Sequence, residues 1–334
     1  MHTDPGSRIH LVSALKSKLA VESVEKCIKH SPNVLEVHLI KGRILKHQGD
    51  LIGALEQVEK AFSLDPGDKY LGSKVAKYQL RAGLIQPAIN TMGRFTKSGE
   101  GVLSYLESTQ CLWFFLHLAR AYHRENRFDD CLSACFTISN IFKTMESAEY
   151  DFHQYSLLKL RLSTYVDQLR KSDSIRQNYF FIEAATLAVQ VYIKLYDQSV
   201  ENRKNNNLPN ILKEQKKNRK ELQNNKLNSN PTVSLDLENC SEPLLGNCKF
   251  FLNHLMLAAQ DKLVTNELAA SVYLRTRKPL LVLQAIHRMQ KCPNSQDSII
   301  KFSAQLSRSI QNSVMDARIK SILTKSLEKL SPTL

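Results

Sequence analysis

One pattern of small and turn-forming residues recurs every 34 residues through the N-terminal third of the chain. Its members are Ala20, Ala54 and Ala88, Cys27 and Ala61, Gly42 and Ala76, Gly49 and Gly83, and Pro32 and Pro66. Small side chains at fixed positions let neighbouring helices approach closely, glycine permits a tight turn, and proline ends a helix. The period therefore predicts pairs of antiparallel helices that stack into an array.

A 34-residue unit of two helices is typical of tetratricopeptide repeats. In the first unit, residues 34–64, Gly49 forms the turn and Pro66 follows the end of the second helix. A second unit follows at residues 69–95, and a third begins near Gln110 after extra loop residues. Because no stretch shows the alternation typical of strands, the sequence predicts an all-α fold, a helical solenoid of tetratricopeptide-repeat type.

Further helices are expected on both sides of a polar segment. Periodic apolar residues predict helices over residues 150–170, 179–196, 248–258, 265–273, 280–289 and within 315–330. In the first of them, Leu158 and Leu162 belong to a stripe that we expect to face the core. Residues 201–230 hold ten Asn and eight Lys or Arg against three Glu, and so have little to bury. The expected parts are a repeat array over residues 8–197, an Asn/Lys-rich linker over 198–247, and a C-terminal helical segment over 248–330 that includes a further repeat near 265–289.

The sequence contains no arrangement typical of a catalytic centre. No nucleophile elbow, zinc-protease motif, phosphate-binding loop or kinase signature occurs. The run Gly99-Glu100-Gly101 has the glycines of an acetyl-CoA-binding loop, but Thr96 stands where that loop needs Arg or Gln, and no strand precedes it. Cys131 and Cys135 are four residues apart on a predicted helix; without further ligands they suit buried small-residue positions better than a metal site. We therefore expect no catalytic residues and no bound metal.

Charge, hydropathy and cysteine content indicate the class of partner and the compartment. The net charge of +14 and the pI near 9.4 favour nucleic acid, anionic membranes, phosphate-rich small molecules or acidic proteins. The longest apolar run, residues 111–116, is too short to span a bilayer, and the N-terminus has no hydrophobic signal region. An odd number of cysteines without Cys-x-x-Cys favours reduced thiols. We expect a cytoplasmic, or also nuclear, protein with no membrane partner.

Basic residues collect on the face that a tetratricopeptide array turns toward its concave groove. The first helix of each unit lines that groove, and Gly49, Gly83 and Asn126 set the register. The predicted groove residues are Arg43, Lys46 and His47, then Lys77 and Arg81, then Arg120, His123 and Arg124, with Lys69 and Lys74 at the edge. Lys41 takes a normally apolar position, which suits an ammonium that emerges beside a ligand. Stacked like charges predict a bound polyanion; screening of the charges by water and salt is the alternative.

A second basic feature lies within the predicted linker. In helical geometry Lys213, Lys216, Lys217 and Lys220 share one face, with Arg219 in the same run. Such a face suits phosphate backbones through counterion release, although no aromatic residues interleave to stack on bases. A solvated linker without a partner is the alternative.

Several stretches are specific enough to indicate a family. They are residues 31–50, 73–78, 110–114, 121–122, 151–155, 163–167, 192–197, 272–275 and 283–288. These stretches resemble the large auxiliary subunit of the N-terminal acetyltransferase A (NatA) complex, also described as NMDA-receptor-regulated protein 1. The resemblance covers most of residues 31–289, and family members are longer at both ends, so we expect the chain to correspond to part of such a subunit.

The resemblance implies a scaffold without catalytic residues of its own that wraps the catalytic acetyltransferase subunit. It implies a complex near the ribosomal exit tunnel that acetylates nascent N-termini, with acetyl-CoA bound by the catalytic subunit. It also implies inositol hexakisphosphate between the two subunits, on a basic segment that matches Lys41, Arg43, Lys46, His47, Lys69, Lys74 and Lys77. The basic run over residues 213–226 matches a Lys/Arg-rich stretch of the family and implies contact with the ribosome and its RNA. The residues also leave open a generic tetratricopeptide adaptor and an RNA-binding helical-repeat protein.

Overall fold

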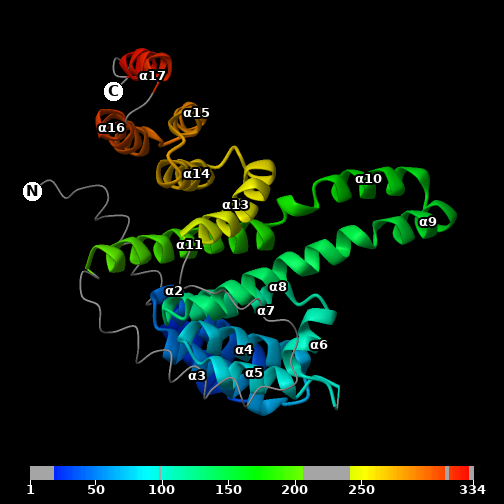
Figure 1. Ribbon diagram of the computed structural model, residues 1–334. Coiled ribbons are helices and arrows are strands. Elements are labelled where there is room, and N and C mark those ends of the chain that lie inside the picture. The colour runs from blue at the N-terminus through cyan, green and yellow to red at the C-terminus, as the bar shows by residue number, and fades with distance from the viewer. Residues whose placement is uncertain (1–18, 98, 206–240, 313–315, 331–334) are drawn as a thin grey trace, which may run out of the picture. The chain divides into compact units, whose positions relative to one another are not determined.

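The computed structural model describes residues 19–97, 99–205, 241–312 and 316–330 (Figure 1). Every regular element in those ranges is helical, which confirms the predicted all-α fold. The chain divides into two compact units, residues 1–150 and residues 151–334. In the described ranges, no helix is both long and apolar enough to cross a membrane.

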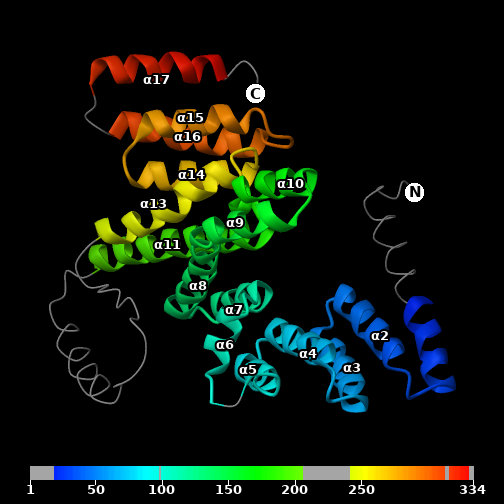
Figure 2. The same ribbon diagram turned by 90° about the vertical axis from the view of Figure 1, so that its right-hand side faces the viewer.

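The first unit is built from three helix pairs that follow one another along the chain (Figure 2). They are α2 (Leu35–Gln48) with α3 (Leu51–Leu64), α4 (Lys69–Ala82) with α5 (Ile85–Gly93), and α7 (Leu112–Arg124) with α8 (Phe128–Ser147). Residues 19–30 form a helix before the first pair, and the short helix α6 (Val102–Ser108) occupies the stretch predicted as extra loop residues. Helix α3 packs against α4, and α4 packs against both α5 and α7. The three predicted repeats are confirmed.

The turn inside each pair is built around one residue in the left-handed conformation. The φ angle is 92° at Gly49, 86° at Gly83 and 58° at Asn126. In each turn the next amide donates to a carbonyl five residues back, as the Asp50 amide does to the Leu45 oxygen at 3.1 Å. Glycine adopts this conformation without strain, and Asn tolerates it better than most residues. The residues that set the predicted register therefore end the first helices.

Small residues bring the helices of a pair together, as the period predicts. A Cβ atom at Gly42 would lie 2.8 Å from Val58 Cγ2 and 3.1 Å from the carbonyl oxygen of Ala54. Ala76 and Ala119, which take the place of Gly42 in the next two pairs, are fully buried. At Gly42 the helices α2 and α3 therefore pack so closely that even a Cβ atom would crowd its neighbours.

The second unit, with α9 at its start, is a succession of antiparallel and stacked helices. Its elements are α9 (Glu149–Lys159), α10 (Leu162–Asp173), the 3-10 helix η1 (Ile175–Gln177), α11 (Tyr179–Asn205), α13 (Ser241–Ala258), α14 (Leu263–Arg275), α15 (Pro279–Met289), α16 (Gln296–Asn312) and α17 (Ala317–Leu330). Helix α11 packs against α13 and α14, α14 packs against α15, and α16 and α17 follow on α15. The α14–α15 turn resembles those of the first unit, because Arg277 has a φ of 54° and the Lys278 amide donates to the Tyr273 carbonyl at 2.9 Å. The repeat predicted near residues 265–289 is therefore present.

The prediction of one continuous helix across α9 and α10 is wrong. The chain leaves helical geometry at Arg161, whose ψ is 145°, and α10 folds back along α9 (Figure 1). The fold-back lets the Tyr165 hydroxyl meet Nδ1 of His153 at 3.3 Å, whereas a continuous helix would hold these residues about 18 Å apart. As a result Leu158 and Leu162, which were expected in the core, are 80% and 75% exposed.

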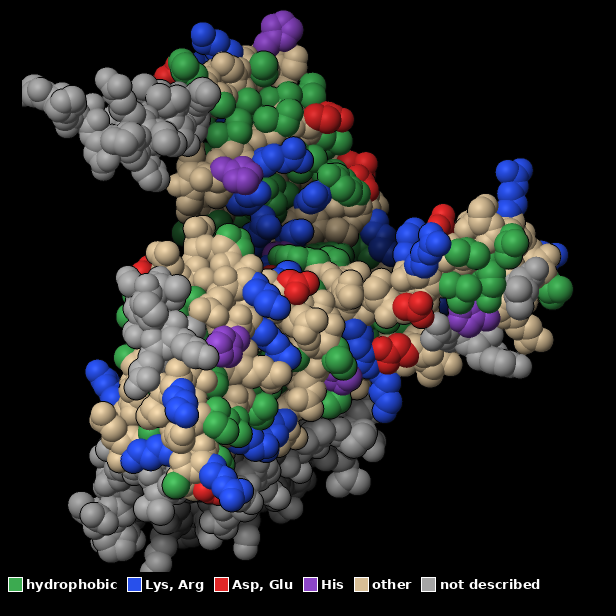
Figure 3. All heavy atoms as spheres, turned by 90° about the horizontal axis from the view of Figure 1, so that it is seen from above, with side chains coloured by type: hydrophobic (Ala, Val, Ile, Leu, Met, Phe, Trp, Pro, Cys, Tyr) green, Lys and Arg blue, Asp and Glu red, His purple; other side chains and the backbone are tan. Residues whose placement is uncertain are grey.

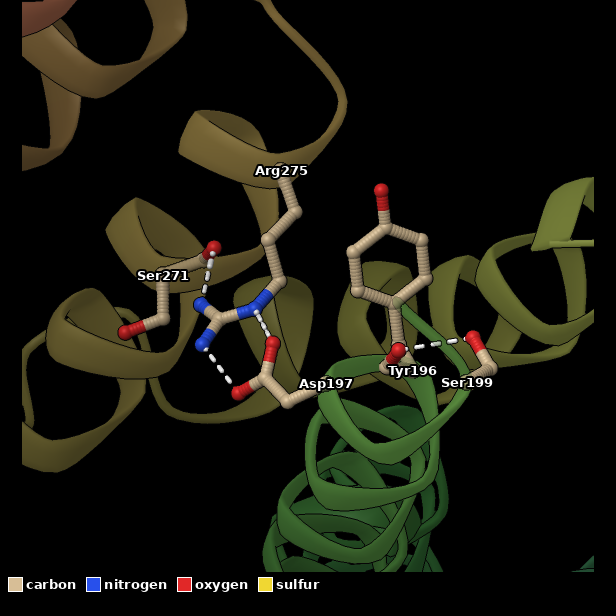
Figure 4. A network of polar contacts seen from close by, with 5 residues as sticks. All are labelled: Tyr196, Asp197, Ser199, Ser271 and Arg275. Atoms are coloured by element: carbon tan, nitrogen blue, oxygen red, sulfur yellow. Dashed lines mark hydrogen bonds and ion pairs between the residues drawn. The ribbon is translucent and has the colours of Figure 1, made fainter. Parts of the chain in front are cut away.

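An ion pair joins α11 to α14 (Figure 4). The Nε and Nη2 atoms of Arg275 donate to the two carboxylate oxygens of Asp197 at 2.8 and 2.6 Å, and Nη1 donates to the Ser271 carbonyl at 2.9 Å. This two-point geometry is the strongest form of an arginine–carboxylate contact. Because α11 packs with helices that follow the predicted linker, the boundary predicted at residue 197 falls inside one unit. Residues 206–240 of that linker lie outside the described residues.

Replacing Gly42 by alanine should destabilise the first unit by about 1 kcal/mol, because overpacking of about 1–3 kcal/mol outweighs a helix-propensity gain of up to about 1 kcal/mol. The matched control is Gly246 in α13, where a Cβ atom would meet nothing within 4 Å. Gly246→Ala should stabilise its own unit by about 0.5–1 kcal/mol. Urea unfolding measures both changes. A Gly42→Ala chain as stable as the wild type would contradict the close approach of α2 and α3.

Candidate functional site

The basic residues predicted to share one face lie on α2, α4 and α7, the first helix of each pair. Arg124 fixes the register of α7 on α4, because its guanidinium donates to the Arg81 and Leu80 carbonyls at 2.5 and 2.6 Å. Arg81 and Arg124 are 43 residues apart, as are Ala76 and Ala119. The two hydrogen bonds place the Arg124 side chain at the C-terminal end of α4. The charge of Arg120 on α7 also acts on Lys77 of α4.

We define the basic surface by the cations that act on one another across these helices, together with His117, on which several of them act. They are Arg43, Lys46, Lys74, Lys77, Arg81, His117, Arg120 and Arg124. Burial lowers the pKa of Lys46, and neighbouring cations on α2 and α4 lower it further. Burial also lowers the pKa of Lys77, with further contributions from cations on α4, α2 and α7. Side chains from three helices thus share one electrostatic environment.

Five cations of the basic surface lie without an acidic partner at ion-pair distance among the described residues. Within the part of the chain that the structure describes, no ion pair is formed by Arg43, Lys46, Lys74, Lys77 or Arg81. Two of these cations lie over aromatic rings: Lys74 is 4.9 Å from the centre of the Tyr70 ring, and Arg81 is 5.5 Å from that of Tyr78. On the face of the molecule that Figure 3 shows, which is seen from above the view of Figure 1 and carries side chains of many elements, Lys and Arg (blue) recur and Asp and Glu (red) are sparser. Cations from three helices that act on one another without an acidic partner can hold an anion with several charged groups.

His117 is a member of the basic surface that sequence reasoning missed. Burial is the first cause of its shifted pKa, and Lys77, Arg81, Arg120 and Arg124 add to it, so that the pKa falls from 6.5 to about 3. The imidazole is therefore neutral at physiological pH. His117 stands three residues before Arg120 on α7, a spacing that puts two residues on one face of a helix, and this is the sequence signal that could have identified it.

Three predicted ligand residues lie apart from this set. Lys41 pairs with Glu25 of the preceding helix, with Nζ and Oε1 3.1 Å apart. It does so because residues two apart on a helix point about 200° from each other, so Lys41 cannot follow Arg43. Lys69 lies near the start of α7, where its charge acts on the Cys111 thiol, whose pKa is raised by burial. His47 is exposed at the C-terminal end of α2.

Other predicted residues take the following places. The His123 ring lies 6.3 Å from that of Phe128, centre to centre, on the α8 side of α7 rather than in the basic surface. Cys131 and Cys135 are buried, and a hydrogen bond with Cys131 together with burial raises the pKa of Cys135. In the described ranges, no group of three or more His, Cys, Asp or Glu could hold a metal ion. The linker residues Lys213, Lys216, Lys217, Arg219 and Lys220 lie outside the described residues.

The fold and this surface define a class: an all-α helical-repeat protein whose first helices present adjacent basic residues. Residues 8–230, more than half of the chain, match the family described as N-terminal acetyltransferase A, auxiliary subunit. The chain therefore belongs to the family of NatA auxiliary subunits.

Individual relatives and a solved structure agree with this family. The chain is 29% identical over 350 residues to N-alpha-acetyltransferase 16, NatA auxiliary subunit, of Homo sapiens, which covers 93% of the chain and 40% of the relative. It is 28% identical over 317 residues to the N-terminal acetyltransferase A complex auxiliary subunit NAA15 of Arabidopsis thaliana, covering 85% and 35%. A structure of Naa15/Naa10 bound to HypK-THB matches with a TM-score of 0.79 and 29% identity, covering 94% of this chain and 43% of that one. The chain spans about two fifths of the length of these relatives.

The first unit should lose stability in acid because of His117. Its pKa in the folded protein, about 3, lies below the ordinary 6.5, so the unfolded chain takes up the proton first. Stability therefore falls as the pH decreases from about 6.5 toward about 3. We expect a loss of about 1 kcal/mol between about pH 7 and pH 5 after solvent screening. His117→Gln should remove this loss and His47→Gln should keep it, as urea unfolding at both pH values measures; equal losses in all three chains would refute the assignment.

Proposed function

We propose that the chain is part of a non-catalytic scaffold subunit that binds the catalytic subunit of a NatA acetyltransferase and supports acetylation of nascent N-termini. Its membership of the auxiliary-subunit family supports this function, as does its similarity over 94% of its length to Naa15 in a structure with Naa10. Acetyl-CoA is then bound by the catalytic subunit, and this chain supplies surface rather than chemistry. A helical solenoid suits that role, because stacked repeats present an extended surface to a second protein.

The single observation that carries the ligand proposal is the basic surface on α2, α4 and α7. Lys46 and Lys77 lie on different helices, yet each feels the positive charge of the other helix, and neither has an acidic neighbour within ion-pair distance among the described residues. A compact ligand with many phosphates would bridge the helices, since each phosphate monoester carries a charge of about −1.5 to −2 at neutral pH. Inositol hexakisphosphate has this chemistry, and we propose it as a structural ligand of the surface.

We also propose that the protein acts in the cytoplasm, in contact with the ribosome. A scaffold that acts on nascent chains works beside the ribosome, and the net charge of +14 favours contact with ribosomal RNA. The basic run from Lys213 to Lys220 is the proposed contact. Because such contact is made with phosphates, it should weaken steeply as the salt concentration rises.

Co-purification with the NatA catalytic subunit tests the scaffold role. This chain and the catalytic subunit should elute together. If inositol hexakisphosphate lies between the two proteins, the Lys46→Glu/Lys77→Glu variant should bind the catalytic subunit more weakly. The matched control is Lys60→Glu/Lys143→Glu, which changes the net charge equally at exposed positions on α3 and α8. If the catalytic subunit fails to bind even when the chain is extended to the length of its relatives, the scaffold role is wrong.

Thermal unfolding with inositol hexakisphosphate tests the ligand. A ligand at about 100 times its Kd stabilises the folded protein by about 2.7 kcal/mol, so the melting temperature should rise by several degrees. Lys46→Glu/Lys77→Glu should abolish the rise, and Lys60→Glu/Lys143→Glu should keep it. Glutamate at these two positions replaces repulsion from the neighbouring cations by attraction, so we expect the variant to fold. A missing rise in its melting temperature then reports the loss of ligand binding. An undiminished rise in the Lys46→Glu/Lys77→Glu variant would place the ligand elsewhere.

A further inference from the structure

The hairpin of α9 and α10 differs from the rest of its unit in how little of it is covered (Figures 1 and 2). The structure describes every residue of α10, and none of them is buried. Packing of either helix against another element is sparse among the described residues. A polar and aromatic contact holds the hairpin closed, since the Tyr165 hydroxyl meets His153 Nδ1 and the two rings stand edge to face with centres 5.8 Å apart. Apolar side chains on so open a pair of helices stay in contact with water.

Large apolar side chains are exposed along α9 and at the turn of the hairpin. Tyr155 and Leu158 are 64% and 80% exposed and stand three residues apart, a spacing that puts both on one face of α9. Leu162, the first residue of α10, is 75% exposed. Figure 3 shows hydrophobic side chains (green) gathered on this hairpin, which lies farthest to the right in that view. Single exposed apolar side chains are normal, but a group of them marks a contact with another molecule.

Two cations lie beside the exposed leucines. Lys159 and Arg161 stand in the chain between the two leucines, both are exposed, and neither forms an ion pair with a described residue. The first acid of α10, Asp167, is instead paired with Arg170 at 3.5 Å. The turn therefore presents positive charge next to apolar surface. A partner that covers the leucines must bring acidic groups to the two cations.

We propose that the hairpin is a docking site for an acidic amphipathic helix of a partner protein. Such a helix would lay its apolar stripe on Tyr155, Leu158 and Leu162, and Glu or Asp residues at the edge of the stripe would face Lys159 and Arg161. The pair of helices then becomes a group of three, and the apolar side chains leave the water. The site uses none of the residues of the basic surface, so it stands whether or not that surface binds an anion.

The same observations disfavour two other occupants. In a twofold dimer the patch would meet itself, which brings Lys159 and Arg161 of both copies into one contact, and such like charges oppose association. An anionic membrane would suit the two cations. However, the exposed apolar face continues along α9 from Leu158 to Tyr155, and a face along a helix suits a second helix better than the insertion of a tip.

Fluorescence anisotropy with defined peptides and the whole chain tests the proposal. The probe is an amphipathic peptide of about 20 residues, long enough to form a helix, with leucines at helical spacing and glutamates on both edges of the leucine stripe. Its counterpart carries lysine in place of each glutamate. The glutamate peptide should bind about tenfold more tightly than the lysine peptide, because it gains two ion pairs where the other meets repulsion. The difference should shrink as the salt concentration rises.

A leucine variant with a matched control locates the apolar contact. Leu158→Gln/Leu162→Gln should weaken binding of the glutamate peptide by about tenfold or more, because two apolar side chains no longer become buried. Glutamine is a good helix former, so the hairpin should keep its helices. Ile52→Gln/Leu257→Gln changes two side chains on other helices that are 70% and 81% exposed, and it should bind as the wild type does.

A charge variant tests the acidic character of the partner. Lys159→Glu/Arg161→Glu should reverse the preference, so that the lysine peptide binds more tightly than the glutamate peptide. Lys249→Glu/Lys291→Glu makes the same change of net charge at exposed positions and should keep the preference of the wild type. The reversal is a gain of binding, which a misfolded chain cannot produce.

Several results would overturn the proposal. Failure of the glutamate peptide to bind, or undiminished binding by Leu158→Gln/Leu162→Gln, would show that the hairpin is not the docking site. Equal binding of the two peptides would refute an acidic partner. Self-association of the chain that the leucine variant abolishes would assign the patch to a second copy. Sedimentation with vesicles of phosphatidylserine and phosphatidylcholine that the same variant abolishes would assign it to a membrane.

Discussion

The basic surface depends on three backbone positions at which the chain turns back on itself. Gly49, Gly83 and Asn126 each take a left-handed φ, and each starts a new helix at the same point of its repeat. Because the turns are alike, residues that share a place in the period share a direction in space. Side chains 34 or 43 residues apart therefore gather on one surface, although their neighbours in the chain face elsewhere. The positive charge gathers there because equivalent positions of successive repeats carry basic residues, and not because the sequence has a continuous basic run.

The basic surface lowers the free energy of unfolding of the unit that forms it. Burial and like charges both disfavour the charged forms of Lys46 and Lys77, so these side chains lower the stability of the unit that holds them. The compensation lies in the core, where Gly42 and its alanine counterparts permit close helix packing, and at the end of α4, whose last carbonyls accept hydrogen bonds from Arg124. Charge kept together at the expense of stability is typical of a binding surface, because an oppositely charged ligand relieves the repulsion.

The sequence predicts the periodic part of this protein far better than the rest. Each repeat copies the packing of the one before, so the period predicts the turn at Gly83 and the direction of Lys77. The period does not give the place of Lys41, which lies on another side of α2 from Arg43, as helix geometry shows. It also does not identify His117, which stands among aromatic residues typical of a core. In the second unit, helix α16 and the α9–α10 hairpin were not predicted. Contacts between distant residues decide such features, and local apolar spacing does not reveal them.

The pair formed by Asp197 and Arg275 links two helices whose paired residues are 78 positions apart, and the packing of α11 on α13 and α14 holds these helices together as well. The free energy of connecting two such anchored points grows slowly with the number of connecting residues, by about 0.6 kcal/mol for each doubling. A reporter protein or affinity tag inserted between residues 206 and 240 should therefore leave the surrounding helices in place, which makes that segment a practical point for labelling the subunit.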